Sequence, residues 1–331
     1  FYPSHKKQLM PLRLFISLLL IPISTCLSGQ QIANWSSFYE NGFIWNPALT
    51  AKWTALDVSL SHQQMWTGFD GAPQYSTLSF QYPFYKYGKS SGAGIGLLIE
   101  QDKVGPFAKL GAGLSYSFRL EPQLFGNSED MLSLGVGVRL GKYSYSPEDV
   151  ITYDGLANDP NLMNEIDGSI KPNFSAGFYY MSAPSNYALQ SHYYIGFSVL
   201  QGYPARIFSM PDLNTLYHMT LHLGYRYFAS RRAESFIEPN IMVIRSGKNN
   251  IHAMANIRFE QLNRFWLAGG GATSGEIFVQ TGVILNSDSF LGKFVQDGNI
   301  RIGVKADYTV GLLAQYGGIG YEAFFNYHFD M

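Results

Sequence analysis

Cysteine and charge are both scarce in this 331-residue chain. Cys26 is the only cysteine, so the chain can form no internal disulfide and no multi-thiolate metal site. Charged residues make up 14% of the chain and the net charge is −1, whereas an average soluble domain is about 25% charged. The chain also lacks a run of lysine or arginine that would follow a phosphate backbone, which excludes nucleic acid as a partner.

An apolar segment near the N-terminus, MPLRLFISLLLIPISTCLSGQQ at residues 10–31, has the parts of a secretory signal peptide. Arg13 gives the basic start, an apolar stretch follows, and small residues precede a cleavage site near Gly29. We expect Met10 to be the true start, with residues 1–9 a misassigned extension, and residues 1–29 to be removed on export. Lipidation of Cys26 is the alternative, but Thr25 matches poorly the small residue usual before a lipidated cysteine.

Long apolar runs are missing after residue 31, since none reaches the roughly 18–20 residues that a membrane helix needs. The chain instead alternates apolar residues with glycine, serine or charged residues, and 16% of it is aromatic. This period of two indicates strands of about ten residues, the length that crosses a bilayer when tilted. We predict about fourteen strands, centred on residues 56–60, 78–82, 95–99, 110–120, 132–140, 174–180, 193–199, 221–227, 237–243, 251–259, 265–272, 277–285, 300–308 and 319–329.

Alternation alone fits either a membrane barrel or a water-soluble β-protein. Three features favour an all-β, antiparallel up-and-down barrel of the outer-membrane type over residues 53–331. The face opposite the apolar one is rich in glycine and serine with isolated charges, aromatics gather near strand ends, and the chain finishes in the apolar-aromatic YEAFFNYHFDM. Closing the sheet would also remove its two edges.

Loop lengths suggest how such a barrel sits in the membrane. With both ends in the periplasm, the outward connections fall at residues 65–74, 101–108, 144–172, 201–215, 246–250, 273–275 and 310–318. The two longest connections are both in this set, as in outer-membrane barrels, whose long loops are extracellular. The segment at 286–298 is long for a periplasmic turn.

Three stretches carry a recognisable pattern: NGFIWNPALTA at 41–51, SHQQMWTGFDGAPQYSTLSFQYP at 61–83 and SGAGIGLLIEQDKVGPF at 91–107. They resemble the PorP/SprF family of outer-membrane proteins of the type IX secretion and gliding-motility machinery. The final GYEAFFNYHF is similar to the family's last strand, whereas Trp45 and Leu49 depart from its pattern. The matching residues are Asn46, Pro47, Ala48, Trp66, Gly68, Phe69, Gly71, Ala72, Pro73, Gly94, Gly96, Asp102 and Gly105.

The resemblance implies a β-barrel integral to the cell outer membrane, in contact with membrane lipid, with no enzymatic activity and no cofactor. It implies as partners a large secreted or surface-attached protein, which the barrel would anchor, and the periplasmic ring lipoprotein of the secretion system. Most of the matching residues, together with Asp70, are therefore candidates for partner contact.

The loop TGFDGAP at 67–73 has two interpretations. In the first it is a surface hairpin, in which Gly68 and Gly71 take positive φ and Pro73 stiffens the exit. In the second, Phe69 and Asp70 additionally fold inward or dock a partner. Nothing in the loop supplies the nucleophile, base and orienting group that an enzyme needs.

The predicted lumen also leaves two functions open. Four charged residues fall on the inward face, namely Glu100, Lys109, Arg119 and Arg139. In an open barrel they would line water, and the protein would be a passive, porin-like diffusion channel. If they pair across the lumen, they fill it instead.

The segment at residues 30–52 precedes the first strand and is too aromatic for a free tail, with Trp35, Phe38, Tyr39, Phe43 and Trp45. We expect it to fold against the periplasmic mouth or into the lumen. Deleting residues 31–50 should then destabilise the barrel or change its conductance.

Metal and phosphate sites are not favoured by the remaining residues. His218 and His222 would lie about 13 Å apart along a strand, too far for one ion. Calcium binding by Asp154, Asp159 and Glu165, with Asp167, is an alternative to simple solvation of that loop. Gly94 and Gly96 are not followed by a third glycine and a helix, as a phosphate loop requires.

Overall fold

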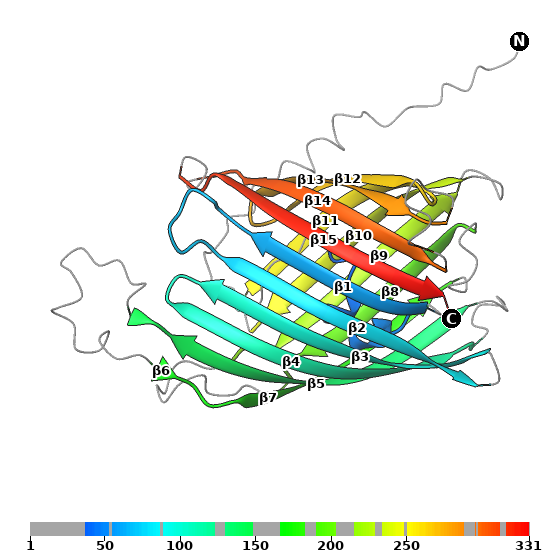
Figure 1. Cartoon of the computed structure of the whole chain (residues 1–331), viewed down its shortest axis with the longest axis horizontal. Coiled ribbons are helices and arrows are strands. Elements are labelled where there is room, and N and C mark those ends of the chain that lie inside the picture. Colours follow the sequence, from blue (N-terminus) through cyan, green and yellow to red (C-terminus); the bar gives the residue numbers. More distant parts are fainter. Residues whose placement is uncertain are drawn as a thin grey trace, which may run out of the picture.

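In the computed structural model, fourteen long antiparallel strands close into a barrel (Figure 1). The structure describes residues 37–52, 55–86, 89–122, 130–147, 166–182, 190–202, 215–228, 234–247, 250–287, 295, 297–311 and 316–330. The long strands are β1 (Ala55–Gln64), β2 (Gln74–Lys86), β3 (Lys89–Val104), β4 (Phe107–Leu120), β5 (Met131–Tyr145), β7 (Lys171–Met181), β8 (His192–Leu200), β9 (His218–Phe228), β10 (Ser235–Ser246), β11 (Asn250–Gln261), β12 (Phe265–Ala272), β13 (Glu276–Leu285), β14 (Asn299–Thr309) and β15 (Ile319–Asp330).

The barrel closes where the first strand meets the last. β1 pairs with β15 along its whole length, from Ala55 opposite Asp330 to Gln64 opposite Tyr321. Every other long strand pairs with its neighbours in sequence order, so each of the fourteen long strands described has a partner on both sides. The predicted fold class is therefore confirmed. The short strand β6 (Ile166–Asp167), which pairs with the end of β5, was not predicted.

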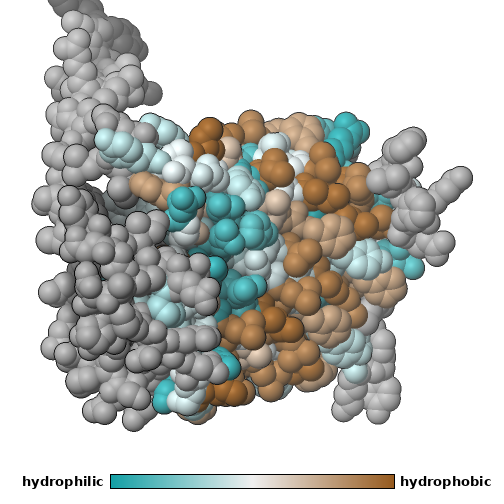
Figure 2. Space-filling model, turned by 60° about the vertical axis from the view of Figure 1, so that its left-hand side comes forward, coloured by the Kyte–Doolittle hydropathy of each residue, from teal (hydrophilic) through white to brown (hydrophobic). Residues whose placement is uncertain are grey.

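The two faces of the wall differ as the alternation predicts. In β1, the buried Asp57, Ser59 and Ser61 point inward, while Leu60 is 54% exposed on the outer face. Exposed apolar side chains cover the outside in the same way on β3, β11 and β13. On the face of the molecule that Figure 2 shows, brown apolar atoms cover a broad part of the wall. This inside-out pattern places apolar surface against lipid and polar surface in the lumen.

The two ends of the barrel are distinct. We call the end where β1 begins and β15 finishes the entry end, and the opposite one the loop end (right and left in Figure 1). The connections after β1, β3, β5, β8, β10, β12 and β14, which are those we expected on one side, all lie at the loop end. Residues 148–165 and 203–214 of the two longest, and most of 288–296 at the entry end, lie outside the described residues.

Residues 37–52 lie inside the barrel, and we call them the plug (blue in Figure 1). They contain two short 3-10 helices, η1 (Gly42–Ile44) and η2 (Pro47–Leu49). Aromatic and aliphatic side chains of the plug form the core with inward residues of the wall, a cluster that includes Phe38, Phe43, Ile44, Trp45, Leu49, Tyr75, Leu98, Tyr179, Tyr194, Met242 and Met254. No helix within the described part of the chain is long and apolar enough to cross a membrane.

Candidate functional site in the barrel lumen

The Asn46-Pro47-Ala48 motif fixes the plug to the wall. The Asn46 side chain accepts a hydrogen bond from the Ala48 N–H (2.9 Å) and so caps η2, whose first residue is Pro47. Asparagine at the cap and proline at the first position are the residues that favour a helix start. The Asn46 amide then donates to the carbonyls of Phe178 (2.9 Å) and Phe197 (3.4 Å) on β7 and β8.

Two glycines of the wall make room for this motif. A Cβ atom on Gly135 of β5 would overlap the backbone of Pro47 and Ala48. A Cβ atom on Gly177 of β7 would overlap the Asn46 side-chain oxygen. At these two wall positions the plug lies closer to the wall backbone than any residue other than glycine would allow. The motif residues that we proposed as partner contacts are buried here, in contact with the barrel itself.

Wall side chains supply hydrogen bonds to the backbone carbonyls of the plug. Ser133 donates to Ala48 (2.6 Å) and Ser117 to Thr50 (2.6 Å). Arg119 donates to Ala51 (2.7 Å) and to Lys52 (2.9 Å), and Arg139 and Ser198 donate to Ile44 and Trp45 in the same way. A buried segment with only two short 3-10 helices needs such partners, because each unpaired carbonyl costs free energy. The polar wall is therefore complementary to the plug.

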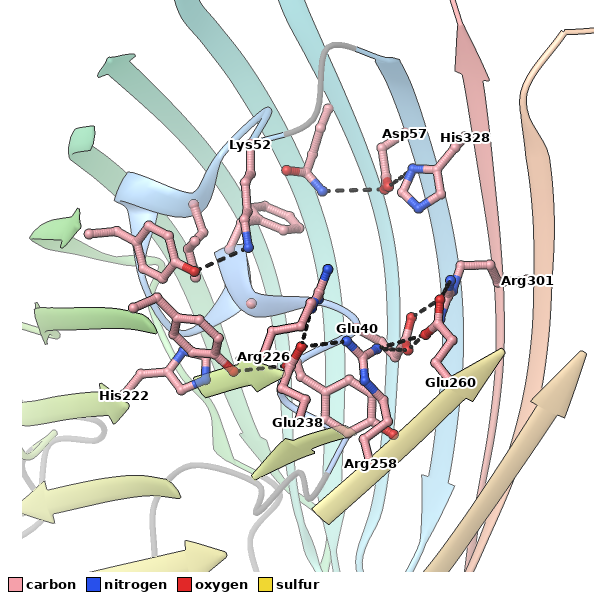
Figure 3. Close-up of a pocket in the computed structure, with 17 residues that line it drawn as sticks. Glu40, Lys52, Asp57, His222, Arg226, Glu238, Arg258, Glu260, Arg301 and His328 are labelled. Atoms are coloured by element: carbon pink, nitrogen blue, oxygen red, sulfur yellow. Dashed lines mark hydrogen bonds and ion pairs between the residues drawn. The ribbon is translucent and has the colours of Figure 1, made fainter. Parts of the chain in front are cut away.

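A network of ion pairs holds the first part of the plug (Figure 3). Glu40 pairs with Arg258 (3.1 Å) on β11 and with Arg301 (3.0 Å) on β14. Arg258 also contacts Glu238 (3.1 Å), and Arg301 contacts Glu260 (2.9 Å). These side chains are at most 12% exposed, so each charge depends on its partners for the solvation that water no longer provides.

The four lumen-facing charges predicted from the sequence all point inward. Glu100 lies 2.6 Å from Lys109 and 3.6 Å from Arg139, while Arg119 binds the plug carbonyls described above. Lys305 forms a third group, with Glu276 (3.2 Å), Asp307 (3.0 Å) and Glu322 (3.7 Å). The charges thus pair along one wall, between neighbouring strands, and Arg119 reaches the plug, which fills the space that the second arrangement assigned to charge pairs across the lumen.

A cavity of about 120 Å³ remains between the plug and the wall in the entry half of the barrel. Its wall residues come from the entry halves of their strands, such as Asp57 early in β1, Arg226 late in β9 and His328 late in β15. Asp57 is bound by His328 (2.8 Å), Ser59 (2.9 Å) and Asn326 (3.0 Å). On the plug side, Lys52 donates to the Tyr179 hydroxyl (3.1 Å).

Lys52 has an unusual electrostatic setting. Burial, with Arg226 and Arg258 nearby, lowers its pKa from the usual 10.5 to about 7, although Glu238 acts in the opposite direction. Its ammonium group also faces the rings of Tyr179 (4.9 Å) and Tyr194 (5.8 Å). The amine therefore titrates near neutral pH.

The loop that carries Trp66, Gly68 and Gly71 lies on the rim of the loop end. The Trp66 indole N–H donates to Thr309 (3.0 Å) on β14, and the Gly68 N–H donates to the Gly317 carbonyl (3.0 Å). The expectation that Gly68 takes a positive φ is wrong, because the left-handed residues here are Trp66 (φ 51°) and Gly71 (φ 73°). Gly68 is needed for another reason, since a Cβ atom there would overlap the Tyr316 carbonyl.

The other half of the loop reaches the next hairpin. The Gly105 N–H donates to the Gly71 carbonyl (2.8 Å), and Asp102 lies three residues earlier on β3. Ala72 is buried, and the Pro73 carbonyl accepts from the Met65 N–H (2.9 Å). The motif residues thus join three neighbouring hairpins. On this rim, Phe69 is half-buried and Asp70 is exposed.

The largest charge network was missed at the sequence level. Glu238, Arg258, Glu260 and Arg301 sit at inward positions of predicted strands, so the alternation contained the signal that each faces the lumen. Their pairing depends on the strand register and on Glu40, and the alternation of the sequence gives no sign that Glu40 lies beside them.

Of the acidic loop considered for calcium, only Asp167 lies within the described residues. No group of three His, Cys, Asp or Glu in that described part could hold a metal ion.

Comparisons with solved structures match 124 chains. CymD, a monoaromatic hydrocarbon channel, shares 8% identity with a TM-score of 0.51, over 88% of this chain and 92% of CymD. A Pseudomonas aeruginosa FadL homologue shares 11% identity, with a TM-score of 0.47 over 91% of this chain and 95% of that one. The KdgM porin shares 9%, with a TM-score of 0.38 over 82% and 99%. At these identities the likeness concerns the fold alone.

The comparison with curated proteins finds no match. A family model, the type IX secretion system membrane protein PorP/SprF, matches residues 27–327. That range includes the plug, its Asn46-Pro47-Ala48 motif and nearly the whole barrel. The chain therefore belongs to the PorP/SprF family of type IX secretion system membrane proteins.

Proposed function

We propose that this outer-membrane barrel is a non-enzymatic adaptor of the type IX secretion and gliding machinery, which anchors a large secreted protein at the cell surface. The observation that carries the proposal is the filled lumen. Plug and wall are joined by backbone hydrogen bonds and by ion pairs such as Glu40–Arg258. A barrel closed in this way is a scaffold whose ends are available for other proteins.

The filled lumen speaks against a passive diffusion channel. The described residues leave a cavity of only about 120 Å³ in the entry half. In the other half, Glu100, Lys109 and Arg139 form an ion cluster instead of lining open water. We expect the purified full-length protein to show little conductance in a planar bilayer.

The orientation follows from the lengths of the connections. Long connections gather at the loop end, which in outer-membrane barrels is extracellular. The entry end then faces the periplasm, where the ring lipoprotein of the machinery would bind. Export through a cleaved signal peptide at residues 1–29 is part of the same proposal.

The rim of the loop end is the surface that we assign to the secreted partner. The bonds from the 65–73 loop to β14 and to Gly105 hold this rim in one conformation. A rigid rim favours binding, because less conformational entropy is lost on association. Asp70 and the side chain of Phe69 provide one charge and one apolar surface there.

The proposal includes no catalytic role, and one His–Ser contact bears on that point. A hydrolase would need a nucleophile, a base and an orienting group in one chain of contacts. His218 does contact a hydroxyl, that of Ser246 (2.6 Å), but its other ring nitrogen has no hydrogen-bond partner. The pair is therefore explained by packing.

Gene deletion tests the function in the cell. We expect the deletion strain to lose surface display of at least one large secreted protein, and reintroduction of the gene to restore it. As a matched pair, Asp70→Asn alters the exposed rim, whereas Glu234→Gln alters an exposed charge at the entry end. Normal display of every large secreted protein in the deletion strain would contradict the proposal.

A further inference from the structure

A second, smaller cavity lies between the plug and the part of the wall where β1 pairs with β15. Its volume is about 10 Å³, close to the ~10–15 Å³ that a single water molecule needs. Most of the side chains that line it carry oxygen, among them Ser37, Asn41, Ser59, Ser61, Glu322 and Asn326. The cavity therefore has room for one small particle, which would be surrounded mainly by oxygen atoms.

Three buried oxygen atoms at this cavity have no hydrogen-bond partner among the described residues, namely Asn41 Oδ1, Asn326 Oδ1 and Glu322 Oε2. The three residues are only 6%, 3% and 1% exposed. Burying an oxygen without a partner costs free energy. Such atoms are few in folded proteins, and an ordered water or a bound ion commonly explains them. They therefore indicate that the cavity takes a ligand.

Glu322 brings a negative charge to the cavity. Its Oε1 atom accepts a short hydrogen bond from the Ser37 hydroxyl. The Lys305 ammonium lies 3.7 Å from Glu322 Oε2, which is too far for a hydrogen bond. The same ammonium is closer to Asp307 (3.0 Å) and to Glu276 (3.2 Å). The buried Glu322 carboxylate would therefore be stabilised by a further positive charge in the cavity.

The neighbouring groups are already held by other partners. Glu40 also lines the cavity, but both of its oxygens accept hydrogen bonds from Arg258 and Arg301. The amide nitrogen of Asn326 donates to Asp57 (3.0 Å). This bond fixes which end of the Asn326 amide is the donor, so that its oxygen is the end available to a ligand.

We propose that this cavity binds one small monovalent cation, of the size and charge of sodium, between Asn41, Asn326 and Glu322. Carboxylate and amide oxygens are ligands that hard cations prefer. A water molecule can donate only two hydrogen bonds, so it would leave one of the three oxygens without a partner, whereas a cation can contact all three. A single positive charge matches the single carboxylate that lacks a close cation.

A cation at this position would join the plug to the wall. Asn41 belongs to the plug, whereas Glu322 and Asn326 belong to β15. A ligand that binds only the folded arrangement stabilises it in proportion to its concentration. The cation would act independently of the adaptor function, because only the contact between plug and wall is involved.

Equilibrium dialysis measures this binding directly. Purified full-length protein in detergent is dialysed against increasing concentrations of radioactive sodium ions, with choline keeping the ionic strength constant. We expect saturable binding that approaches one sodium ion per chain. Absence of saturable binding would overturn the proposal and leave the cavity to water.

Thermal stability gives a second readout of the same site. The temperature at which the folded band disappears in unboiled gels is compared in sodium chloride and in choline chloride at equal ionic strength. We expect sodium to raise this temperature by about 2–4 °C. Equal temperatures in the two salts would contradict a cation that joins the plug to the wall.

A pair of variants locates the site. Asn41→Ala removes one of the three oxygens and should weaken sodium binding by at least about tenfold, the equivalent of one lost hydrogen-bond-sized contact. Asn256→Ala is the matched control, because Asn256 is buried, its amide oxygen also has no partner among the described residues, and it does not line this cavity. Sodium binding that is equal in Asn41→Ala and Asn256→Ala would overturn the assignment.

A third variant covers the case in which Asn41→Ala does not fold. Glu322→Gln keeps the shape of the side chain but removes its charge, so it should lose saturable sodium binding. Binding equal to that of the natural chain would overturn the role of Glu322.

Discussion

At the scale of single residues, the plug and the wall lie so close together that no atom could be added between them at two positions. Gly135 faces the backbone of Pro47 and Ala48, and Gly177 faces the side chain of Asn46, so closely that neither position has room for a Cβ atom. The motif and these glycines lie about ninety residues or more apart in the chain. Sequence patterning shows that each glycine faces inward, but only the folded barrel shows what it meets.

We therefore expect Gly135→Ala to destabilise the protein by about 1–3 kcal/mol, the usual cost of overpacking. The measurement is the temperature at which the folded band disappears in unboiled gels. Gly269→Ala on β12 is the control, because a Cβ atom there meets only one neighbour, at 3.6 Å. Equal behaviour of the two variants would contradict the close packing of the motif.

Glu40 is the acidic residue that joins the plug to both Arg258 and Arg301. Glu40→Gln removes one partner from two buried cations, and breaking a buried pair costs about 3–5 kcal/mol. We expect a lower urea midpoint and faster proteolysis of residues 37–52. Glu234→Gln, at an exposed position, should change neither. An unchanged midpoint in Glu40→Gln would show that the network does not hold the plug.

Lys52 makes stability depend on pH in a defined direction. Its pKa is lowered to about 7 in the folded protein, from 10.5. Between these values the unfolded chain binds a proton that the folded protein does not, so this group favours folding more as pH rises through that range. The difference in urea midpoint between the natural chain and Lys52→Met should therefore change progressively from pH 7 to pH 10. A difference that is constant with pH would contradict the lowered pKa.

At the scale of elements, the strands and the packing of the plug segment were predictable, whereas the contacts of the plug were not. Period-two alternation located every long strand, because each must show one face to lipid and one to the lumen. FWLAGGGA at 265–272, which includes three consecutive glycines, forms β12. The aromatic content of residues 30–52 indicated a packed segment, yet the partners of Glu40 and Asn46 depend on strand register. The two-residue β6 has too little length for any periodicity.

The plug as an element gives its own prediction. Deleting residues 31–50 removes Glu40, the Asn46 cap and most of the aromatic core. We expect this variant to unfold at lower temperature, or to show higher single-channel conductance than the full-length protein. Unchanged values of both quantities would contradict the plug as a structural part of the lumen.

At the scale of the whole molecule, a filled lumen and two different ends are the features on which the proposed adaptor function rests. The outer wall is apolar, the inside is filled, and the rim at the loop end is joined across hairpins by Trp66 and Gly71. The family places the chain in the type IX secretion system. Its partners depend on the surface chemistry of the two ends, which alternation does not encode.

The most direct test of the adaptor account is purification of the tagged full-length protein from its native outer membrane in mild detergent, followed by mass spectrometry. The account predicts recovery of a large secreted protein, the ring lipoprotein of the secretion system, or both, at levels well above those with an unrelated tagged barrel. It further predicts that Asp70→Asn reduces recovery of the secreted protein, whereas Glu234→Gln does not. Recovery of a barrel without either partner would contradict the central claim.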